Sequence, residues 1–131
     1  MQLDRTFFDE MVEHGLAAFP NESCGLLAGK EGRPAKFFPM SNADASPVTY
    51  RLDAKEQLRV FDEIDEQGWE LLGIFHTHTH SEAYPSETDR TQAFYPEAEH
   101  LVMSLSDRAN PVLRSFRIDD DEIVEQELEI V

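Results

Sequence analysis

Residues 73–90 hold three of the five histidines of this 131-residue chain, within five positions of one another. His76 and His78 are separated by one residue, and after seven more residues the chain continues as Ser86-x-x-Asp89. Imidazole nitrogens and a carboxylate oxygen are ligands that zinc prefers, although other divalent ions also accept them. Two histidines and one carboxylate leave a fourth position for water, as in catalytic sites. The segment therefore predicts a metal site formed by His76, His78 and Asp89.

The spacing of His76 and His78 requires an extended backbone. Residues two apart share a face of a strand, whereas on a helix they point about 200° apart. The apolar run before the pair predicts a strand over 70–78, on which Ile74 shares the face of both histidines. His80 forms an equally good local pair with His78, but it follows the expected strand end in a polar turn. We therefore expect His80 outside the ligand set.

Ser86 and Asp89 also have a purely structural interpretation. They resemble a capping box that begins a helix, with aspartate in place of the usual glutamate or glutamine. The two interpretations are compatible, because an acid in the first helical turn is held rigidly, as a third ligand must be. Solvent-exposed histidines on a strand end are the competing explanation of the pattern. Taken alone, Glu22 can be a surface acid, and we expect structural roles for His14 and His100.

The elements that must position these residues follow from the hydrophobic pattern. Amphipathic helices are expected over 4–19 and 54–67, and a shorter helix over 87–94. Asp53 should cap the second helix and Gly68 should end it. Strands are expected over 22–29, 35–40, 48–52, 70–78, 100–106, 112–118 and 122–130. This order predicts an α/β fold with one mainly antiparallel, curved sheet, flanked by two longer helices and one short helix.

The composition predicts a single domain over 1–131, because 40% hydrophobic residues can form a core without disulfides. The formal charge of −16 argues against nucleic acid and anionic membranes as partners, although solubility alone also explains it. A membrane span or signal peptide is not expected, since neither an apolar run of 18 residues nor a basic-then-apolar N-terminus occurs. The single cysteine, Cys24, suits a reducing cytoplasm.

Glu22, His76-x-His78 and Ser86-x-x-Asp89 together resemble the JAMM motif of the MPN-plus metalloproteases. The run Glu-Ser-Cys-Gly-Leu-Leu that begins at Glu22 is also typical of the family, and the resemblance extends over the whole chain. It implies a cytidine-deaminase-like fold with one zinc ion per chain. It also implies cleavage of peptide or isopeptide bonds after the C-terminal Gly-Gly of ubiquitin-like proteins.

The resemblance further implies a role for each residue. Zinc held by His76, His78 and Asp89 would lower the pKa of its water from 15.7 to about 7. Glu22 would accept the proton of that water and later pass it to the leaving amine. Ser86 would help to stabilise the oxyanion, a contribution typically worth about 3 kcal/mol.

One departure from the family pattern indicates a subgroup. Many members have proline after the second histidine, where this chain has Thr79. Thr79, the run 82–86, Asn42 and Tyr50 are similar to the small bacterial members of the Mec type, which release cysteine from the ubiquitin-like sulfur carrier CysO. This likeness implies a cytoplasmic enzyme of cysteine biosynthesis, and it specifies no oligomeric state. The alternatives are a trimming protease that exposes Gly-Gly, a general isopeptidase, a cysteine hydrolase using Cys24, and a non-catalytic MPN scaffold.

Overall fold

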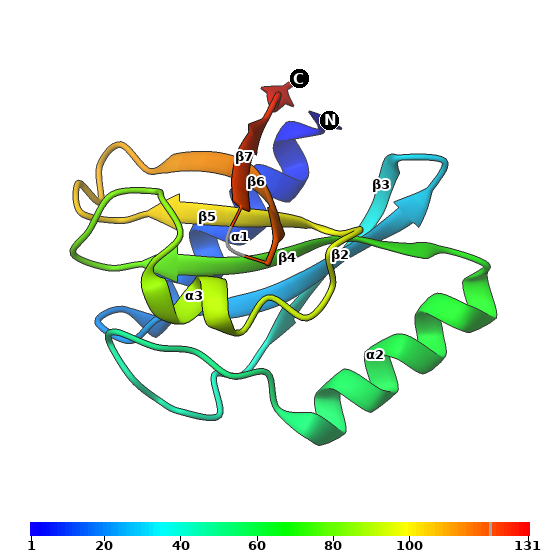
Figure 1. The fold of residues 1–131 in the computed structure, drawn as a ribbon, viewed down its shortest axis with the longest axis horizontal. Coiled ribbons are helices and arrows are strands. Elements are labelled where there is room, and N and C mark those ends of the chain that lie inside the picture. Colours follow the sequence, from blue (N-terminus) through cyan, green and yellow to red (C-terminus); the bar gives the residue numbers. More distant parts are fainter. Residues whose placement is uncertain (121) are drawn as a thin grey trace.

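A computed structural model describes residues 1–120 and 122–131 of the chain. It contains a six-stranded sheet with α1 on one face and α2 and α3 on the other (Figure 1). None of the helices in these two ranges has the length and apolar character needed to cross a membrane. The elements in chain order are β1 (Gln2–Leu3), α1 (Arg5–Ala18), β2 (Cys24–Lys30), β3 (Arg33–Met40), α2 (Ala54–Gln67), β4 (Glu70–His78), α3 (Glu87–Thr91), β5 (Glu99–Ser104), β6 (Val112–Asp119), β7 (Glu122–Gln126) and β8 (Glu129–Ile130).

The strand order of the main sheet is β3-β2-β4-β5-β6-β7. Its pairs are antiparallel except for β4 with β5, so the expected mainly antiparallel sheet is confirmed. A parallel pair needs a crossover connection, and here that connection contains α3. The crossover therefore carries α3 past the end of β4 that holds the histidines.

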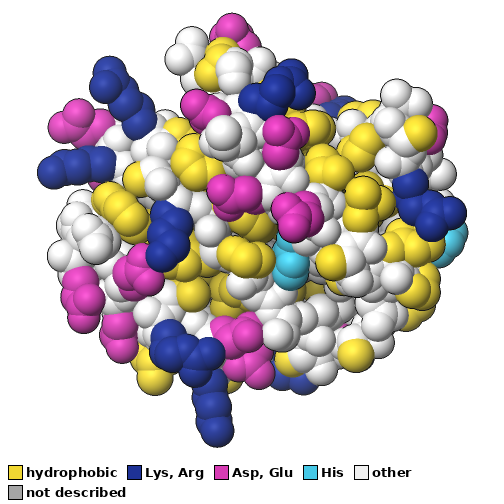
Figure 2. Space-filling view, turned by 180° about the vertical axis from the view of Figure 1, so that it is seen from behind, with side chains coloured by type: hydrophobic (Ala, Val, Ile, Leu, Met, Phe, Trp, Pro, Cys, Tyr) yellow, Lys and Arg dark blue, Asp and Glu magenta, His cyan; other side chains and the backbone are white. Residues whose placement is uncertain are grey.

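The core lies on both faces of the sheet, because neighbouring residues of a strand point to opposite sides. Leu27 and Phe75 pack with Met11 beneath α1, whereas Leu26 and Ile74 pack in the core that α2 covers. The alternation of β4 therefore turns its histidines toward the face of α2 and α3. Figure 2 shows the molecule from behind the view of Figure 1. On that face, acidic and basic side chains are interspersed with apolar ones and form no large patch of a single charge.

The helix boundaries follow the expected capping chemistry. Asp4 caps α1, and its carboxylate accepts the N–H of Thr6. Asp53 caps α2 by accepting the N–H of Glu56, and Gly68 ends that helix in the left-handed conformation with φ of 70°. The third helix is shorter than predicted, since it ends at Thr91 rather than at residue 94.

The prediction of a strand over 48–52 is wrong. Only one isolated bridge occurs there, between Asn42 and Leu52. The side chain of Asn42 takes the place of a strand partner: its Oδ1 accepts the N–H of Arg51 at 3.0 Å, and its Nδ2 donates to the carbonyl of Thr49 at 2.9 Å. Residues 41–53 therefore form a loop held by side-chain hydrogen bonds.

The prediction of one strand over 122–130 is also wrong. β7 remains in the main sheet, whereas β8 leaves it and pairs in parallel with β1, which was not predicted. Leu128 lies between the two strands and packs against the α1 core. Residue 121, between the strands predicted over 112–118 and 122–130, lies outside the described residues.

Candidate metal centre

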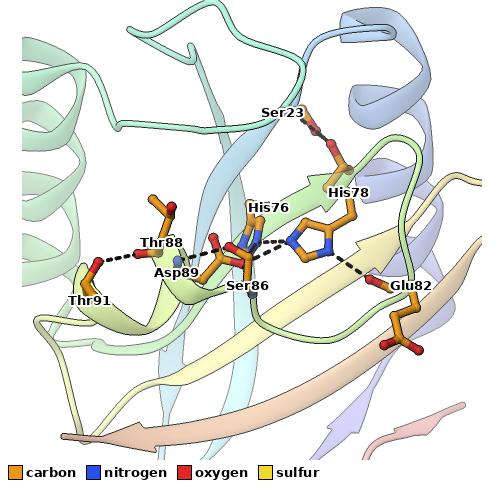
Figure 3. A network of polar contacts seen from close by, with 9 residues as sticks. Ser23, His76, His78, Glu82, Ser86, Thr88, Asp89 and Thr91 are labelled. Atoms are coloured by element: carbon orange, nitrogen blue, oxygen red, sulfur yellow. Dashed lines mark hydrogen bonds and ion pairs between the residues drawn. The ribbon is translucent and has the colours of Figure 1, made fainter. Parts of the chain in front are cut away.

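Three side chains converge at the end of β4 (Figure 3). Nε2 of His76 and Nε2 of His78 each lie 3.0 Å from Oδ2 of Asp89, and the two nitrogens are 3.2 Å apart. All three residues are buried, and together they form a group that could hold a metal ion. A tetrahedral ion with bonds of about 2.0 Å needs ligand atoms roughly 3.3 Å apart. The predicted ligands are therefore close to metal-binding geometry.

The backbone around the two histidines is held on both sides. β4 lies between β2 and β5, so His76 is opposite Cys24 on one strand and Val102 on the other. On the reverse face, Thr77 accepts the N–H of Ser23 at 2.8 Å, which ties β4 to the start of β2. The histidines therefore project from one of the most restrained segments of the sheet.

Asp89 is positioned by the capping box that the sequence predicted. Its N–H donates to Oγ of Ser86 at 3.1 Å, and its Oδ2 accepts the N–H of Ser86 at 2.8 Å. The Ser86 hydroxyl acts as an acceptor in this bond, so its proton remains available to another group. One local motif thus orients a ligand and a hydroxyl donor beside each other.

The electrostatics of the cluster favour a positive charge between the ligands. Burial opposes ionisation of Asp89, but hydrogen bonds from His76 and His78 outweigh it and hold the pKa of the carboxyl well below its usual range. Burial also lowers the pKa of fully buried His76. For His78 burial is outweighed by hydrogen bonds to Asp89 and Glu82, and its pKa is raised. A proton and a cation therefore compete for the same place.

Two outer contacts orient the imidazole rings. Nδ1 of His78 donates to the carbonyl of Glu82 at 2.8 Å, which leaves the Nε2 lone pair of that ring for a metal. The ring of Tyr50 stacks on His76 with centroids 4.5 Å apart. Glu82 and Tyr50 were not predicted to support the site. Their positions depend on how two loops pack. In the sequence, only the family likeness of Tyr50 could have indicated a role at the site.

Glu22 lies beside the cluster although it is 54 residues from His76 in the sequence. It is 4% exposed, and its Oε1 is buried without a hydrogen-bond partner in the described part of the chain. Burial raises the pKa of Glu22 to about 8; the charge of His78 opposes this effect and that of Asp89 adds to it. Glu22, His78 and Ser86 line one cleft of about 370 Å³. The structure thus brings together the five residues singled out in the sequence.

His80 lies at the rim of the same cleft and outside the three-ligand group, as expected. The Thr79 hydroxyl donates to the carbonyl of Pro47 at 3.2 Å and accepts the Nδ1–H of His80 at 2.8 Å. Proline in place of Thr79 could make neither bond. The threonine therefore fastens the 41–53 loop to the end of β4.

The surroundings of His14, His100 and Cys24 do not indicate that these residues take part in catalysis. Nε2 of His14 lies 2.9 Å from the carbonyl of Cys24 and 3.0 Å from that of Met40, so it ties α1 to two strands. Burial lowers the pKa of His100 to about 4, an effect to which His76 contributes. Burial raises the pKa of the Cys24 thiol to about 12, which argues against a cysteine nucleophile.

Comparisons with known proteins agree with this geometry. A family model described as prokaryotic homologues of the JAB domain matches residues 4–119. The chain is 42% identical over 123 residues to the CysO-cysteine peptidase of Mycobacterium tuberculosis, covering 92% of this chain and 84% of that protein. It is 38% identical over 88 residues to the desampylase of Haloferax volcanii, covering 65% of this chain and 63% of that protein.

Two solved structures share the fold. A protein from Desulfitobacterium hafniense, determined in solution, has a TM-score of 0.90 at 35% identity, covering 99% of this chain and 92% of that chain. A JAB1/MPN domain protein from Archaeoglobus fulgidus has a TM-score of 0.67 at 19% identity, covering 100% and 99%, a likeness that shows the fold alone. The family model spans most of the chain, and the mycobacterial relative matches nearly all of it. The chain therefore belongs to the prokaryotic JAB family of JAMM/MPN proteins and is a metallopeptidase.

Proposed function

We propose that this chain, as a single JAMM domain over 1–131, is a cytoplasmic zinc peptidase of cysteine biosynthesis. It hydrolyses the amide bond after the C-terminal Gly-Gly of a ubiquitin-like sulfur carrier and releases cysteine. The observation that carries this proposal is the cleft that Glu22 shares with His78 and Ser86, in which Oε1 of the buried Glu22 has no hydrogen-bond partner among the described residues. The mycobacterial relative, which is named a CysO-cysteine peptidase, supports the choice of substrate.

The proposed chemistry divides among five side chains. His76, His78 and Asp89 would hold one zinc ion, which supplies Lewis acidity by lowering the pKa of a water ligand from 15.7 to about 7. Glu22 takes a proton from the attacking water on its Oε1 and delivers it to the leaving amine. Its raised pKa suits both steps near neutral pH, because the carboxyl can hold and then release the proton. Ser86 donates its hydroxyl proton as a hydrogen bond to the developing oxyanion.

The substrate tail must approach from outside β4. Both edges of that strand are paired, with β2 and β5, so an extended peptide cannot add to it as a further strand. The cleft is bordered instead by the 41–53 loop, where Val48 is 73% exposed. We therefore place the Gly-Gly tail against this loop.

The experiment uses the zinc-loaded protein and a carrier that ends in Gly-Gly-Cys. We expect mass spectrometry to show loss of one cysteine and a free Gly-Gly end. Glu22→Gln is the matched control, because the amide fills the same space but cannot carry the proton, so this variant should bind zinc without cleaving. An intact carrier after treatment with the zinc-loaded wild type would contradict the proposal.

A second candidate is a general isopeptidase, which the match to the desampylase favours. The test for it is the same carrier joined through Gly-Gly to a lysine side chain. Faster cleavage of that conjugate than of the cysteine adduct would assign the isopeptidase activity. Loss of a longer peptide from an extended carrier would assign trimming instead. If the protein purified from cells supplied with zinc contains no zinc and shows neither activity, the result would favour a non-catalytic MPN scaffold.

A further inference from the structure

Two buried ring nitrogens near the metal centre have no hydrogen-bond partner among the described residues. They are Nδ1 of His76 and Nε2 of His100. His76 is fully buried and His100 is 3% exposed, so bulk water does not satisfy either ring. Because nearly all buried polar atoms in proteins are paired, each of these nitrogens needs a partner.

The two rings belong to adjacent strands and to the same face of the sheet. The parallel register of β4 and β5 places Ile74 opposite His100, and His76 is two residues further along the same face. His100 is therefore the diagonal neighbour of His76. The electrostatic influence of His76 on His100 agrees with this proximity. Figure 3 shows β5, in yellow, beside the strand that carries both ligands.

The roles of the two nitrogens follow from the ligand geometry. Nε2 of His76 faces Asp89 and His78, so Nδ1 is the ring atom that carries the proton. A metal-bound histidine almost always donates this second N–H to an acceptor. For His78 the acceptor is the carbonyl of Glu82. For His76 the described residues provide no such carbonyl or carboxylate, whereas His100 is a neutral ring with an unpaired nitrogen.

A cavity beside His100 can supply a water that links the two rings. Its volume is about 360 Å³, and Tyr50, Ile74 and His100 are among the residues that line it. Tyr50 is the residue that stacks on His76, so the cavity begins one ring away from the metal ligand. A buried water needs polar partners, and the two unpaired nitrogens offer one donor and one acceptor.

We propose that His100 is the positioning residue of His76. In the zinc-loaded protein its Nε2 accepts, through one buried water, the hydrogen bond that Nδ1–H of His76 donates. This bond fixes the tautomer and the ring plane of His76, so that Nε2 points at the metal. The inference rests on the proposed metal site, but it concerns zinc affinity rather than cleavage.

The test measures the zinc dissociation constant by competition with a chelating dye. His100→Leu should weaken zinc binding about 10- to 100-fold, as loss of an outer-shell partner does. His100→Gln should restore affinity to within about threefold of the wild type, because its amide oxygen can reach the place of Nε2. The thermal midpoint of metal-free His100→Leu should not fall, since the lost Nε2 has no hydrogen-bond partner among residues 1–120 and 122–131.

His14→Leu is the matched control. His14 is a histidine of α1 that bonds two backbone carbonyls, so its replacement should lower stability without changing zinc affinity. Nitrogen NMR of the zinc-loaded wild type provides a second measurement, which should show a slowly exchanging proton on Nδ1 of His76. The inference is overturned if His100→Leu binds zinc within twofold of the wild type, or if Nδ1 of His76 is the metal-bound atom. Wild type that binds zinc but leaves the carrier intact would refute only the proposed substrate.

Discussion

The two faces of β4 share one backbone but differ in role: one packs in the core, and the other carries candidate metal ligands. On the α1 face, Phe75 lies in the apolar core and the Thr77 hydroxyl is paired with the N–H of Ser23. On the other face, His76 and His78 meet Asp89, and Nδ1 of His76 has no hydrogen-bond partner in the part of the chain that the structure describes. A strand that is fully satisfied on one face can hold unsatisfied groups rigidly on the other. The predictions below separate these two tasks.

The largest effect should come from removing a ligand. Asp89→Ala should abolish zinc binding and reduce kcat/KM by on the order of 10³-fold or more, because Lewis acidity is lost with the metal. Elemental analysis of the purified protein checks the metal content. Asp89→Asn keeps an oxygen for the Ser86 N–H but loses the charge, so it distinguishes loss of the ligand from loss of the helix cap. If Asp89→Ala retains a full equivalent of zinc, the ligand assignment is wrong.

The next effect should come from the proton carrier. Glu22→Gln should keep zinc and lose about 10²- to 10⁴-fold in kcat, the usual contribution of general acid–base catalysis. Single-turnover rates at saturating carrier measure this loss directly. Activity near that of the wild type would mean that another group moves the proton.

Glu22 should also make the metal-free protein less stable as the pH rises. Its native pKa of about 8 lies above the ordinary value of about 4.3, so between these values the native state keeps a proton that the unfolded chain has released. Stability is therefore lost as pH increases through this window. Relative to Glu22→Gln, the wild type should lose on the order of 4 kcal/mol by pH 8. Urea unfolding of both proteins at several pH values tests this, and parallel curves would contradict it.

The smallest effect should come from the structural face. Thr77→Val leaves the buried N–H of Ser23 without its acceptor, which should cost about 1–3 kcal/mol of unfolding free energy. Zinc affinity should stay within about twofold, since Thr77 points away from the ligands. Chemical denaturation and dye competition measure the two quantities separately. A large loss of zinc affinity would show that the two faces are coupled.

Much of the fold was accessible from local patterns. An apolar run identified β4, and capping chemistry identified α2 between Asp53 and Gly68. The expected strand over 48–52 failed because one side chain, that of Asn42, replaces the ladder, and sequence periodicity does not report such a substitution. The β1–β8 pair was missed because two-residue strands have no periodicity and their pairing joins the two ends of the chain.

The convergence of the three candidate ligands could be predicted from sequence for a physical reason. His76, His78 and Asp89 lie within 14 residues, so strand geometry and one capping box determine most of their mutual arrangement. The sequence by itself thus determined the grouping of these three side chains and its local scaffold. The tertiary structure decided what surrounds it: the antiparallel register of β2 with β4 brings Glu22 to the cleft, and the parallel register of β4 with β5 brings His100 to His76. Contacts between distant strands depend on how the whole core packs, and no local pattern encodes them.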